Sequence, residues 1–363
     1  MTGHSDTALI ANATTAAVPV APLEVAVVIL TYKSTQLAIN CLRSVAAERG
    51  TPQVHIRAIV VDNASGDLPG ITAAVDENSW NSWVNLVEAP RNGGYAYGNN
   101  LGVRHAFAAG APNYIYLLNP DTEVRPGAIA ALVDFLQGHP EVAIAGSSFE
   151  NPDGSPWPLA FRFPSLVSEF LGGVQFGPLT RLLRRWEVPL FMGSTAARVD
   201  WICGASMLIR PAVLTALGGL DENYFLYFEE TDFCRRARDA GYSTWYVPES
   251  RVMHIGGQST TVAPDARERL PAYWFESRRR YFAVTFGIAH AAAIDLVAVI
   301  AHSLGSVKRV IQRRQHTGVP YFVRDLVRHS VFWKRNRNIP VFRSRIVGGY
   351  TSRAATTERT IRR

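Results

Sequence analysis

Cysteine is scarce in this chain of 363 residues, which contains only Cys41, Cys203 and Cys234 and no CxxC or CxxH spacing. Three scattered thiols argue against a disulfide framework and give no support for a zinc site. The chain also lacks a basic N-terminal stretch followed by an unbroken apolar run and a cleavage site, so residues 1–22 are expected to be a disordered extension. These absences favour a reducing cytoplasm.

Recognisable nucleic-acid-binding motifs are also missing, although the charge is uneven. Residues 1–265 carry 17 Lys and Arg against 25 Asp and Glu, whereas residues 266–363 carry 20 against 5. A C-terminal region with a net charge of +15 is expected to face something anionic. Without a homeodomain, zinc-finger or RNA-binding signature, a lipid surface is favoured over nucleic acid.

A clean membrane-spanning run is absent as well. The apolar stretch from Tyr273 to about Val310 is interrupted by His290, Asp295 and His302. Because a central Asp costs roughly 3 kcal/mol in a spanning helix, we expect an in-plane amphipathic helix pair, with a buried core helix as a nearly equal alternative. The expected basic edges of this pair are Arg278, Arg279, Arg280, Lys308, Arg309, Arg313 and Arg314.

What the first 125 residues do contain is an alternation of β-branched runs with segments of helical spacing. This alternation predicts an α/β fold with a doubly wound, mostly parallel sheet and helices on both faces. The expected strands are 25–30, 56–61, 84–87 and 114–118, and the expected helices are 35–48 and about 99–109.

The pattern continues with helices at 126–137, 211–216 and 229–240 and strands at 142–145 and 201–210. Between them, the Pro- and Gly-punctuated stretch 151–193 is expected to form an acceptor loop or lid. We therefore predict a catalytic domain over 23–265, with a nucleotide half at about 23–125 and an acceptor half at about 126–265, followed by a helical basic region over 266–363.

Polar residues follow the first two expected strands at the point where each ends. Thr31 and Tyr32 follow one, and Asp62 and Asn63 follow the other. The carboxyl ends of neighbouring parallel strands meet in the ligand-binding crevice of open α/β sheets, where an Asp can accept hydrogen bonds from ribose. The alternative is that Asp62 and Asn63 only cap the next turn.

A glycine-rich segment, 91–100, follows the third expected strand and reads RNGGYAYGNN. Gly93 and Gly94 permit close backbone approach, and Arg91 suits a diphosphate. The segment matches neither common nucleotide-binding glycine motif, and it could be structural punctuation before a helix.

Acidic residues follow two later elements. Asp121 comes after the fourth strand, where it serves a divalent cation or an Asx turn equally well. Glu229, Glu230 and Asp232 follow an aromatic run, which favours a raised pKa and a general-base role over a solvated helix N-terminus. His254, at the end of an apolar segment, is by itself more typical of a structural residue.

Taken together and in order, these motifs resemble a family 2 glycosyltransferase of the rhamnosyltransferase type over about residues 24–260. The resemblance rests on strand-end Thr31 and Tyr32, the late His254, and the segments VVDNASGD (60–67), RNGGYAYGNN (91–100), LLNPDTEV (117–124) and GGLDENYFLYFEETDFCRRARDAGY (218–242).

The resemblance implies a GT-A fold, a nucleotide-sugar donor, inversion at the anomeric carbon and a Mg²⁺ or Mn²⁺ ion held through an Asp-x-Asp-like element. It makes Asp121 the principal metal carboxylate, His254 a further ligand and Glu230 the catalytic base, with Asp232 as the alternative base. Asn119 stands at the first Asp position, so it is expected to contact ribose or a metal-bound water. The nucleotide-sugar set is then Thr31, Tyr32, Asp62, Asn63, Arg91, Asn92, Gly93, Gly94, Asn99 and Asn119.

The expected function is transfer of L-rhamnose from dTDP-rhamnose to a polyprenyl-diphosphate-linked N-acetylglucosamine in cell-envelope polysaccharide synthesis. The expected location is the inner face of the cell membrane, as a peripheral protein and a candidate homo-oligomer. UDP-galactofuranose and GDP-mannose are alternative donors, since donor choice depends on pocket shape. A catalytically silent nucleotide-binding or membrane-scaffold protein is the alternative from a different class.

Overall fold

The computed structural model describes residues 22–51, 53–157, 159–256, 269–312, 319–333 and Ile346. The expected disordered extension, apart from Pro22, lies outside the described residues, as do Arg313 and Arg314.

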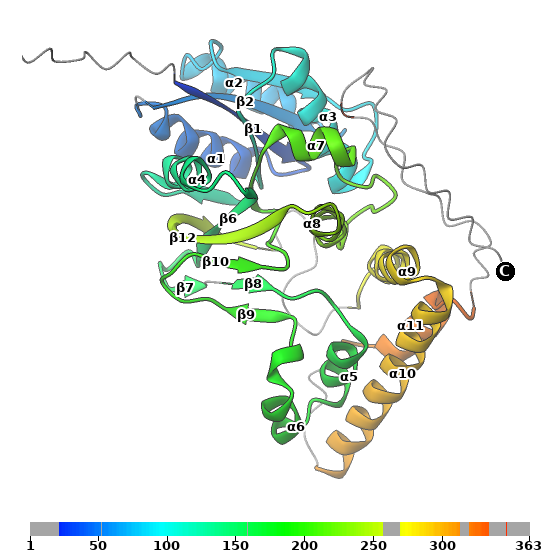
Figure 1. Cartoon of the computed structure of the whole chain (residues 1–363). Coiled ribbons are helices and arrows are strands. Elements are labelled where there is room, and N and C mark those ends of the chain that lie inside the picture. Colours follow the sequence, from blue (N-terminus) through cyan, green and yellow to red (C-terminus); the bar gives the residue numbers. More distant parts are fainter. Residues whose placement is uncertain are drawn as a thin grey trace, which may run out of the picture.

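A central sheet runs through the molecule with the order β10-β12-β6-β11-β4-β1-β2-β3 (Figure 1). Strands β3, β2, β1 and β4 are parallel, β11 is antiparallel to both neighbours, and β12 is parallel to β6. The predicted mostly parallel α/β architecture is therefore confirmed. The main strands are β1 (Leu23–Thr31), β2 (Val54–Asp62), β3 (Val84–Glu88), β4 (Tyr114–Leu118), β6 (Val142–Glu150), β10 (Ala197–Val199), β11 (Ser206–Ile209) and β12 (Ser243–His254).

Helices cover both faces of this sheet because its inner strands are apolar on both sides. In β1, Val27 and Ile29 belong to one buried cluster, whereas Ala26 and Val28 belong to the other. Alternate residues of a strand point to opposite faces, so one continuous apolar run serves two cores. The covering helices are α1 (Thr35–Glu48), α2 (Leu68–Glu77), α3 (Gly94–Ala108), α4 (Ala128–Gly138), α7 (Pro211–Leu217) and α8 (Glu229–Asp239).

Three predictions about local structure are wrong. Of the strand expected over 201–210, only Ser206–Ile209 forms a strand, β11. Helix α3 begins at Gly94, five residues before the predicted start at Asn99, because Gly94 adopts a positive φ of 85° and opens the helix directly. The expected loop 151–193 contains two helices, since Ser165 forms a capping box that starts the apolar α5. The elements in this stretch are β7 (Pro156–Trp157), β8 (Leu159–Phe161), α5 (Leu166–Val174), α6 (Gly177–Leu182), η1 (Arg184–Trp186) and β9 (Pro189–Phe191).

Three helices follow the sheet: α9 (Ala272–Phe286), α10 (Ile288–Ile311) and α11 (Phe322–His329). Figure 1 shows α9 beside α8, with α10 extending away from the sheet alongside α5. Among the described residues, α10 is the one helix that is long and apolar enough to cross a membrane, judged by length and composition alone.

The expectation that Arg278, Arg279 and Arg280 form a lipid-facing basic edge is wrong, because all three are buried in α9. Arg278 donates to Glu169 of α5 and to Asp295 of α10, each at 2.6 Å. Desolvating these charges is tolerable only because each meets a partner. Arg278 and Asp295 therefore join α9, α10 and α5 to one another.

Candidate active site

The predicted strand-end residues do gather at one edge of the sheet. Thr31 and Asp62 are register partners in the parallel strands β1 and β2. The backbone N–H of Asn63 donates to the Thr31 carbonyl at 2.9 Å. The next strand, β4, ends at Leu118 and is followed there by Asn119, whose amide donates to Ala205. Tyr32 lies half-buried beside this edge. The common direction of the strands brings these positions together.

Asp62 has all of its acceptor positions occupied by its own loop. Its carboxylate accepts hydrogen bonds from Ser65 N and Oγ, Gly66 N and Asp67 N, at 2.6 to 3.0 Å. An ionised carboxylate has about four lone-pair sites, so this set is saturated. The geometry corresponds to the turn-capping alternative, and a direct ribose contact by Asp62 stays a prediction.

The second acid of the loop, Asp67, was not among the predicted site residues. It accepts from Ser34 N at 3.0 Å and from Thr35 Oγ1 at 2.8 Å, and Thr31 Oγ1 also donates to it. The Thr31 hydroxyl, which is predicted to contact the nucleotide-sugar donor, therefore already donates its hydrogen to Asp67. Asp67 ties the ends of β1 and β2 together and makes this edge rigid.

The glycine-rich segment joins the strand edge to the aromatic run. Asn63 Nδ2 donates to Asn92 Oδ1 at 3.0 Å, and Gly93 N donates to Asn63 Oδ1 at 3.2 Å. A Cβ added to Gly94 would lie only 2.0 Å from the Phe225 carbonyl oxygen. Gly94 is therefore required by close backbone approach as well as by its positive φ.

The other predicted residues of this segment have different roles. Asn99 donates to the Tyr95 carbonyl at 3.0 Å and so serves helix α3 itself. Arg91 is exposed, with its guanidinium carbon 4.6 Å from the centroid of the Tyr97 ring. Arg91 is consequently accessible to a diphosphate at the N-terminus of α3, a position suited to anions.

Asp121 and His254 are brought together by pairing of the short strand β5 (Thr122–Val124) with β12, in which Thr122 is opposite His254. Ile255 N donates to the Asp121 carbonyl at 3.1 Å. The Asp121 Oδ1 and His254 Nε2 atoms are 3.5 Å apart, and both residues are buried. Two candidate ligands 133 residues apart in sequence thus meet.

The pair has unused binding capacity. Neither Asp121 Oδ1 nor His254 Nδ1 has a hydrogen-bond partner within the described part of the chain, although both atoms are buried. Buried polar atoms are normally satisfied, so both atoms have capacity for a further partner. The nitrogen that faces Asp121 is Nε2. The rings of Phe149 and Trp157, with centroids 5.2 and 6.0 Å from that of His254, restrict the orientation of the imidazole.

This donor set fits a hard divalent cation that takes most of its ligands from elsewhere. Among the described residues, no group of three or more His, Cys, Asp or Glu side chains could hold a metal. Mg²⁺ is commonly bound through one or two carboxylates, with substrate phosphates and water completing the shell. Asp121 and His254 could serve in that way.

Glu229 and Glu230 begin helix α8 after an unusual backbone segment. Tyr227 and Phe228 both have φ of 70°, a left-handed conformation that is strained for aromatic residues. Strain of this kind is concentrated at functional sites. Here it turns the chain so that Glu229 is buried and Glu230 is half-buried. The Oε2 atom of each is buried and lacks a partner among the described residues.

Burial shifts both carboxyl groups toward the protonated form. It raises the pKa of Glu230 to about 7, while hydrogen bonds from the Glu230 and Gly204 amides act in the opposite direction. The pKa of Glu229 is held well above its ordinary value by burial and then by the charge of Glu230. At neutral pH, Glu230 is thus the member of the pair that can exchange a proton.

Tyr95 lies where these acids converge. Its hydroxyl donates to the Gly204 carbonyl at 2.7 Å, and its pKa is raised well above the usual value by burial and by the charges of Glu230, Glu229 and Asp121. Burial and the charge of Glu230 likewise raise the pKa of Cys203 to about 12. Sequence reasoning missed Tyr95, Cys203 and Gly204, although Tyr95 lies inside the glycine-rich motif.

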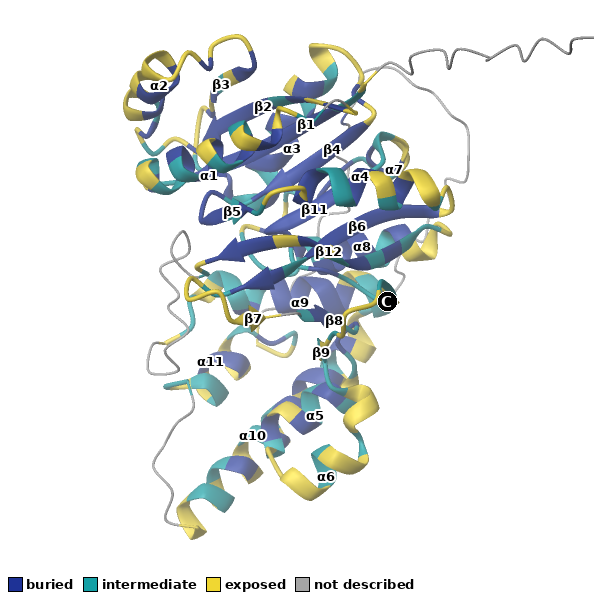
Figure 2. Ribbon diagram, turned by 90° about the vertical axis from the view of Figure 1, so that its left-hand side faces the viewer, coloured by how far each residue is buried: buried dark blue, intermediate teal, exposed yellow. Residues whose placement is uncertain are grey.

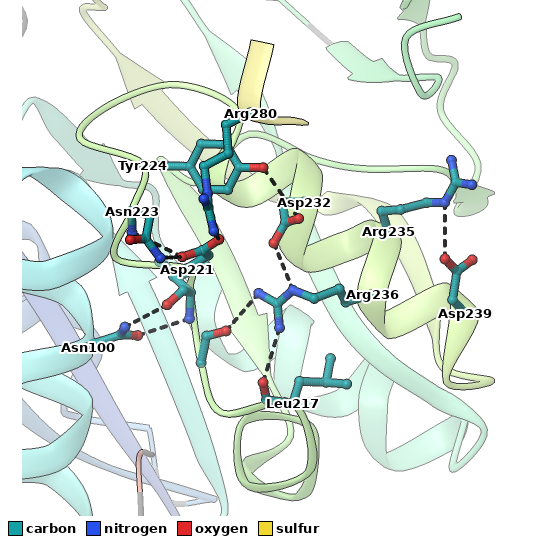
Figure 3. A network of polar contacts seen from close by, with 12 residues as sticks. Asn100, Leu217, Asp221, Asn223, Tyr224, Asp232, Arg235, Arg236, Asp239 and Arg280 are labelled. Atoms are coloured by element: carbon teal, nitrogen blue, oxygen red, sulfur yellow. Dashed lines mark hydrogen bonds and ion pairs between the residues drawn. The ribbon is translucent and has the colours of Figure 1, made fainter. Parts of the chain in front are cut away.

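Asp232, the alternative base, is part of a different network (Figure 3). Arg236 donates to its carboxylate at 2.7 Å, and the same guanidinium donates to the carbonyls of Leu217 and Gly219. The Tyr224 hydroxyl lies 3.5 Å from Asp232. These contacts attach α8 to the loop that follows α7, which is a structural role.

The same loop is held from a second side by α9. Arg280 donates to Asp221 at 2.9 Å, and Ser277 Oγ donates to the Leu226 carbonyl at 2.9 Å (Figure 3 shows the first contact). Asn100 of α3 donates to the Leu220 carbonyl at 2.8 Å. The segment that precedes Glu230 is therefore fixed by α3, α8 and α9 together.

Comparisons with known proteins identify the family to which this sequence is similar. A family model described as glycosyltransferase like family 2 matches residues 21–280. The chain is 31% identical over 238 residues to N-acetylglucosaminyl-diphospho-decaprenol L-rhamnosyltransferase of Mycobacterium tuberculosis, covering 61% of this chain and 72% of the relative. It is 24% identical over 164 residues to rhamnosyltransferase WbbL of Escherichia coli, covering 44% and 60%.

A solved structure supports the fold. The crystal structure of GalNAc-T7 with UDP, GalNAc and Mn²⁺ is similar with a TM-score of 0.50 and 14% identity, covering 84% of this chain and 57% of that one. At this identity the similarity concerns the architecture alone. The matched family region extends past the predicted end of the catalytic domain at residue 265 and includes most of α9.

Proposed function

Because this chain belongs to glycosyltransferase family 2 and is a glycosyltransferase, we propose that it transfers L-rhamnose from dTDP-rhamnose to a polyprenyl-diphosphate-linked N-acetylglucosamine. The observation that carries the proposal is the pair of Asp121 and His254 together with Glu230, whose pKa of about 7 suits proton transfer. The charges of Asp121 and Glu230 both act on Tyr95 and Cys203, which supports one shared site. The rhamnosyltransferase names of two relatives support the sugar, and the first relative's name supports the acceptor.

In the proposed reaction, Glu230 accepts the proton of the acceptor hydroxyl as that oxygen attacks the anomeric carbon. The bond from the anomeric carbon to the diphosphate oxygen breaks as the new glycosidic bond forms, so the configuration inverts. A general base contributes about 10² to 10⁴ in rate when its pKa is near the working pH. The raised pKa of Glu229 favours its neutral form, which limits the negative charge beside the base.

Asp121 and His254 would hold Mg²⁺ or Mn²⁺ at the edge of the sheet. When bound there, a divalent cation supplies positive charge against the departing nucleoside diphosphate. Arg91 and the amides at the N-terminus of α3 bind the same phosphates, and Asn119 contacts the ribose or a metal-bound water. The remaining predicted nucleotide contacts are Thr31, Tyr32, Asp62, Asn63, Asn92, Gly93, Gly94 and Asn99.

A transfer assay tests the proposal directly. The purified chain is incubated with Mg²⁺ or Mn²⁺, a water-soluble diphospho-N-acetylglucosamine acceptor and each donor in turn: dTDP-rhamnose, UDP-galactofuranose and GDP-mannose. We expect a disaccharide product with dTDP-rhamnose and an inverted anomeric configuration by NMR. Preferred transfer from either other donor would assign a different sugar, and no transfer from any donor would favour a non-catalytic role.

A further inference from the structure

The lower end of the molecule in Figure 1 is formed by two segments that are distant in sequence. We call it the tip and define it as residues 175–186, which contain α6 and η1, and residues 304–312 at the end of α10. Lys308 donates to the Gln175 carbonyl, and Arg309 donates to Gln175 Oε1 at 3.1 Å. These contacts attach the two segments of the tip to each other at Gln175.

Close packing behind the tip makes this arrangement firm. A Cβ added to Gly305 of α10 would lie 2.2 Å from the carbonyl oxygen of Gly173 in α5. The glycines let the two helices approach at the distance of backbone contact. The outward-facing side chains are thus presented from a fixed base.

Many large apolar side chains of the tip are exposed to solvent. Leu182 is 77% exposed, Val310 77% and Ile311 76%. Figure 2 shows α6 and the end of α10 as largely exposed. Leu304, Val307 and Ile311 recur at helical spacing and share one face of α10. Exposed apolar surface that gathers in this way marks interaction sites on soluble domains. The complete set of exposed large apolar residues on the tip is Phe176, Leu182, Trp186, Leu304, Val307, Val310 and Ile311.

The charges of the tip all have one sign. Its sequence contains Arg181, Arg184, Arg185, Lys308 and Arg309 and no Asp or Glu. The first three are exposed, and the Arg185 guanidinium carbon lies 5.5 Å from the centroid of the Trp186 ring. Trp beside basic residues is typical of the polar boundary of a bilayer.

We propose that the tip docks in the plane of an anionic lipid surface, with its apolar side chains at the acyl boundary and its cations among the phosphate headgroups. A second copy of the tip would bring five cations against five, which disfavours self-association through this surface. This proposal rests on the proposed function in one respect, which is that a lipid-linked acceptor is expected. It also moves the membrane contact away from the buried arginines of α9.

Vesicle co-sedimentation tests the charges. The full chain is mixed with vesicles of phosphatidylglycerol and phosphatidylcholine in equal parts, without donor or acceptor. The tip variant carries Arg181→Glu with Arg184→Glu, and the matched control carries Arg43→Glu with Arg198→Glu, which are exposed on α1 and β10. We expect the tip variant to bind about tenfold or more weakly, since each cation near an anionic surface contributes about 1 kcal/mol.

In the same assay the control variant should bind like the wild type, and added salt should weaken wild-type binding. Equal binding by the tip and control variants, or no binding by the wild type, overturns the proposal. Thermal unfolding of both variants verifies that they are folded. Transfer to a soluble acceptor by the tip variant should be unchanged, so failure of this inference is separable from failure of the proposed activity.

A second variant tests the apolar part. Leu182→Ser with Val310→Ser leaves every charge in place and should also lower vesicle binding by about tenfold, because two largely exposed side chains lose their insertion. Sedimentation without lipid completes the test. A wild-type dimer that this variant converts to monomer would assign the tip to a second copy of the chain and would overturn the lipid proposal.

Discussion

Two groups of buried acids differ in what surrounds them. In the strand-end loop, Asp62 and Asp67 receive hydrogen bonds from backbone amides and hydroxyls of their own neighbourhood. Across the site, Asp121, Glu229 and Glu230 each keep a buried oxygen without a partner among the described residues. Satisfied acids stabilise a fold, whereas unsatisfied ones cost stability and indicate a ligand or a reaction.

The largest expected effect is on the rate of the reaction. Glu230→Gln should slow the chemical step by about 10² to 10⁴ with donor binding nearly unchanged, because the amide cannot accept the proton. In the wild type, the rate should rise as pH rises through about 7, where the raised pKa of Glu230 places its ionisation. Single-turnover kinetics across pH measure both.

Asp232→Asn is the matched control for the base. It should mainly lower thermal stability, since it weakens the ion pair with Arg236. If Asp232→Asn abolishes the chemical step while Glu230→Gln retains it, the base is Asp232.

The next effect concerns the metal pair. Asp121→Ala should lower transfer by about 10²-fold or more, because a bound cation contributes several kcal/mol to the reaction, and it should leave the melting temperature nearly unchanged. Asp134→Ala, an exposed acid on α4, is the control and should retain activity. Full wild-type activity in excess chelator would refute the metal assignment.

A satisfied acid should behave in the opposite way. Asp62→Ala leaves the amides of Ser65, Gly66 and Asp67 without their acceptor, and we expect about 2 to 4 kcal/mol less stability in urea unfolding. Asp134→Ala should remain within about 0.5 kcal/mol of the wild type. A small loss of stability with a large loss of donor binding would instead assign Asp62 the ribose contact predicted from sequence.

The smallest effect is the stability cost of the base itself. Its folded pKa, about 7, is above the ordinary 4.5, so the protonated form is favoured by folding. The resulting stabilisation is complete below about pH 4.5 and is lost as pH rises through 7. Glu230→Gln should therefore be more stable than the wild type by about 1 to 3 kcal/mol at pH 8 and similar to it at pH 4.5. If the variant and the wild type differ in melting temperature by the same amount at pH 4.5 and pH 8, the ionised Glu230 carboxylate does not destabilise the fold.

Local pattern accounted for most elements between residues 23 and 125, although helix α2 was not predicted. The predicted helix 35–48 coincides with α1, and the four predicted strands coincide with β1 to β4 within two residues at each end. Strand and helix periodicity are properties of a few neighbouring residues, so they can be read from the sequence. The capping box at Ser165 is also a local sequence signal. It was missed because the Pro and Gly residues around it indicated a loop.

Residue types and their order determined which chemistry this protein can perform: carboxylates after strands, glycines before a helix and acids after an aromatic run. Tertiary structure alone decided which of them act together. Sheet pairing joined Asp121 to His254, and the ion pair with Arg236 distinguished Asp232 from Glu230. Tertiary packing also turned the arginines of α9 inward and left Arg181, Arg184 and Arg185 of the tip exposed. Desolvation and partner geometry depend on contacts between distant segments, and no local window of sequence contains them.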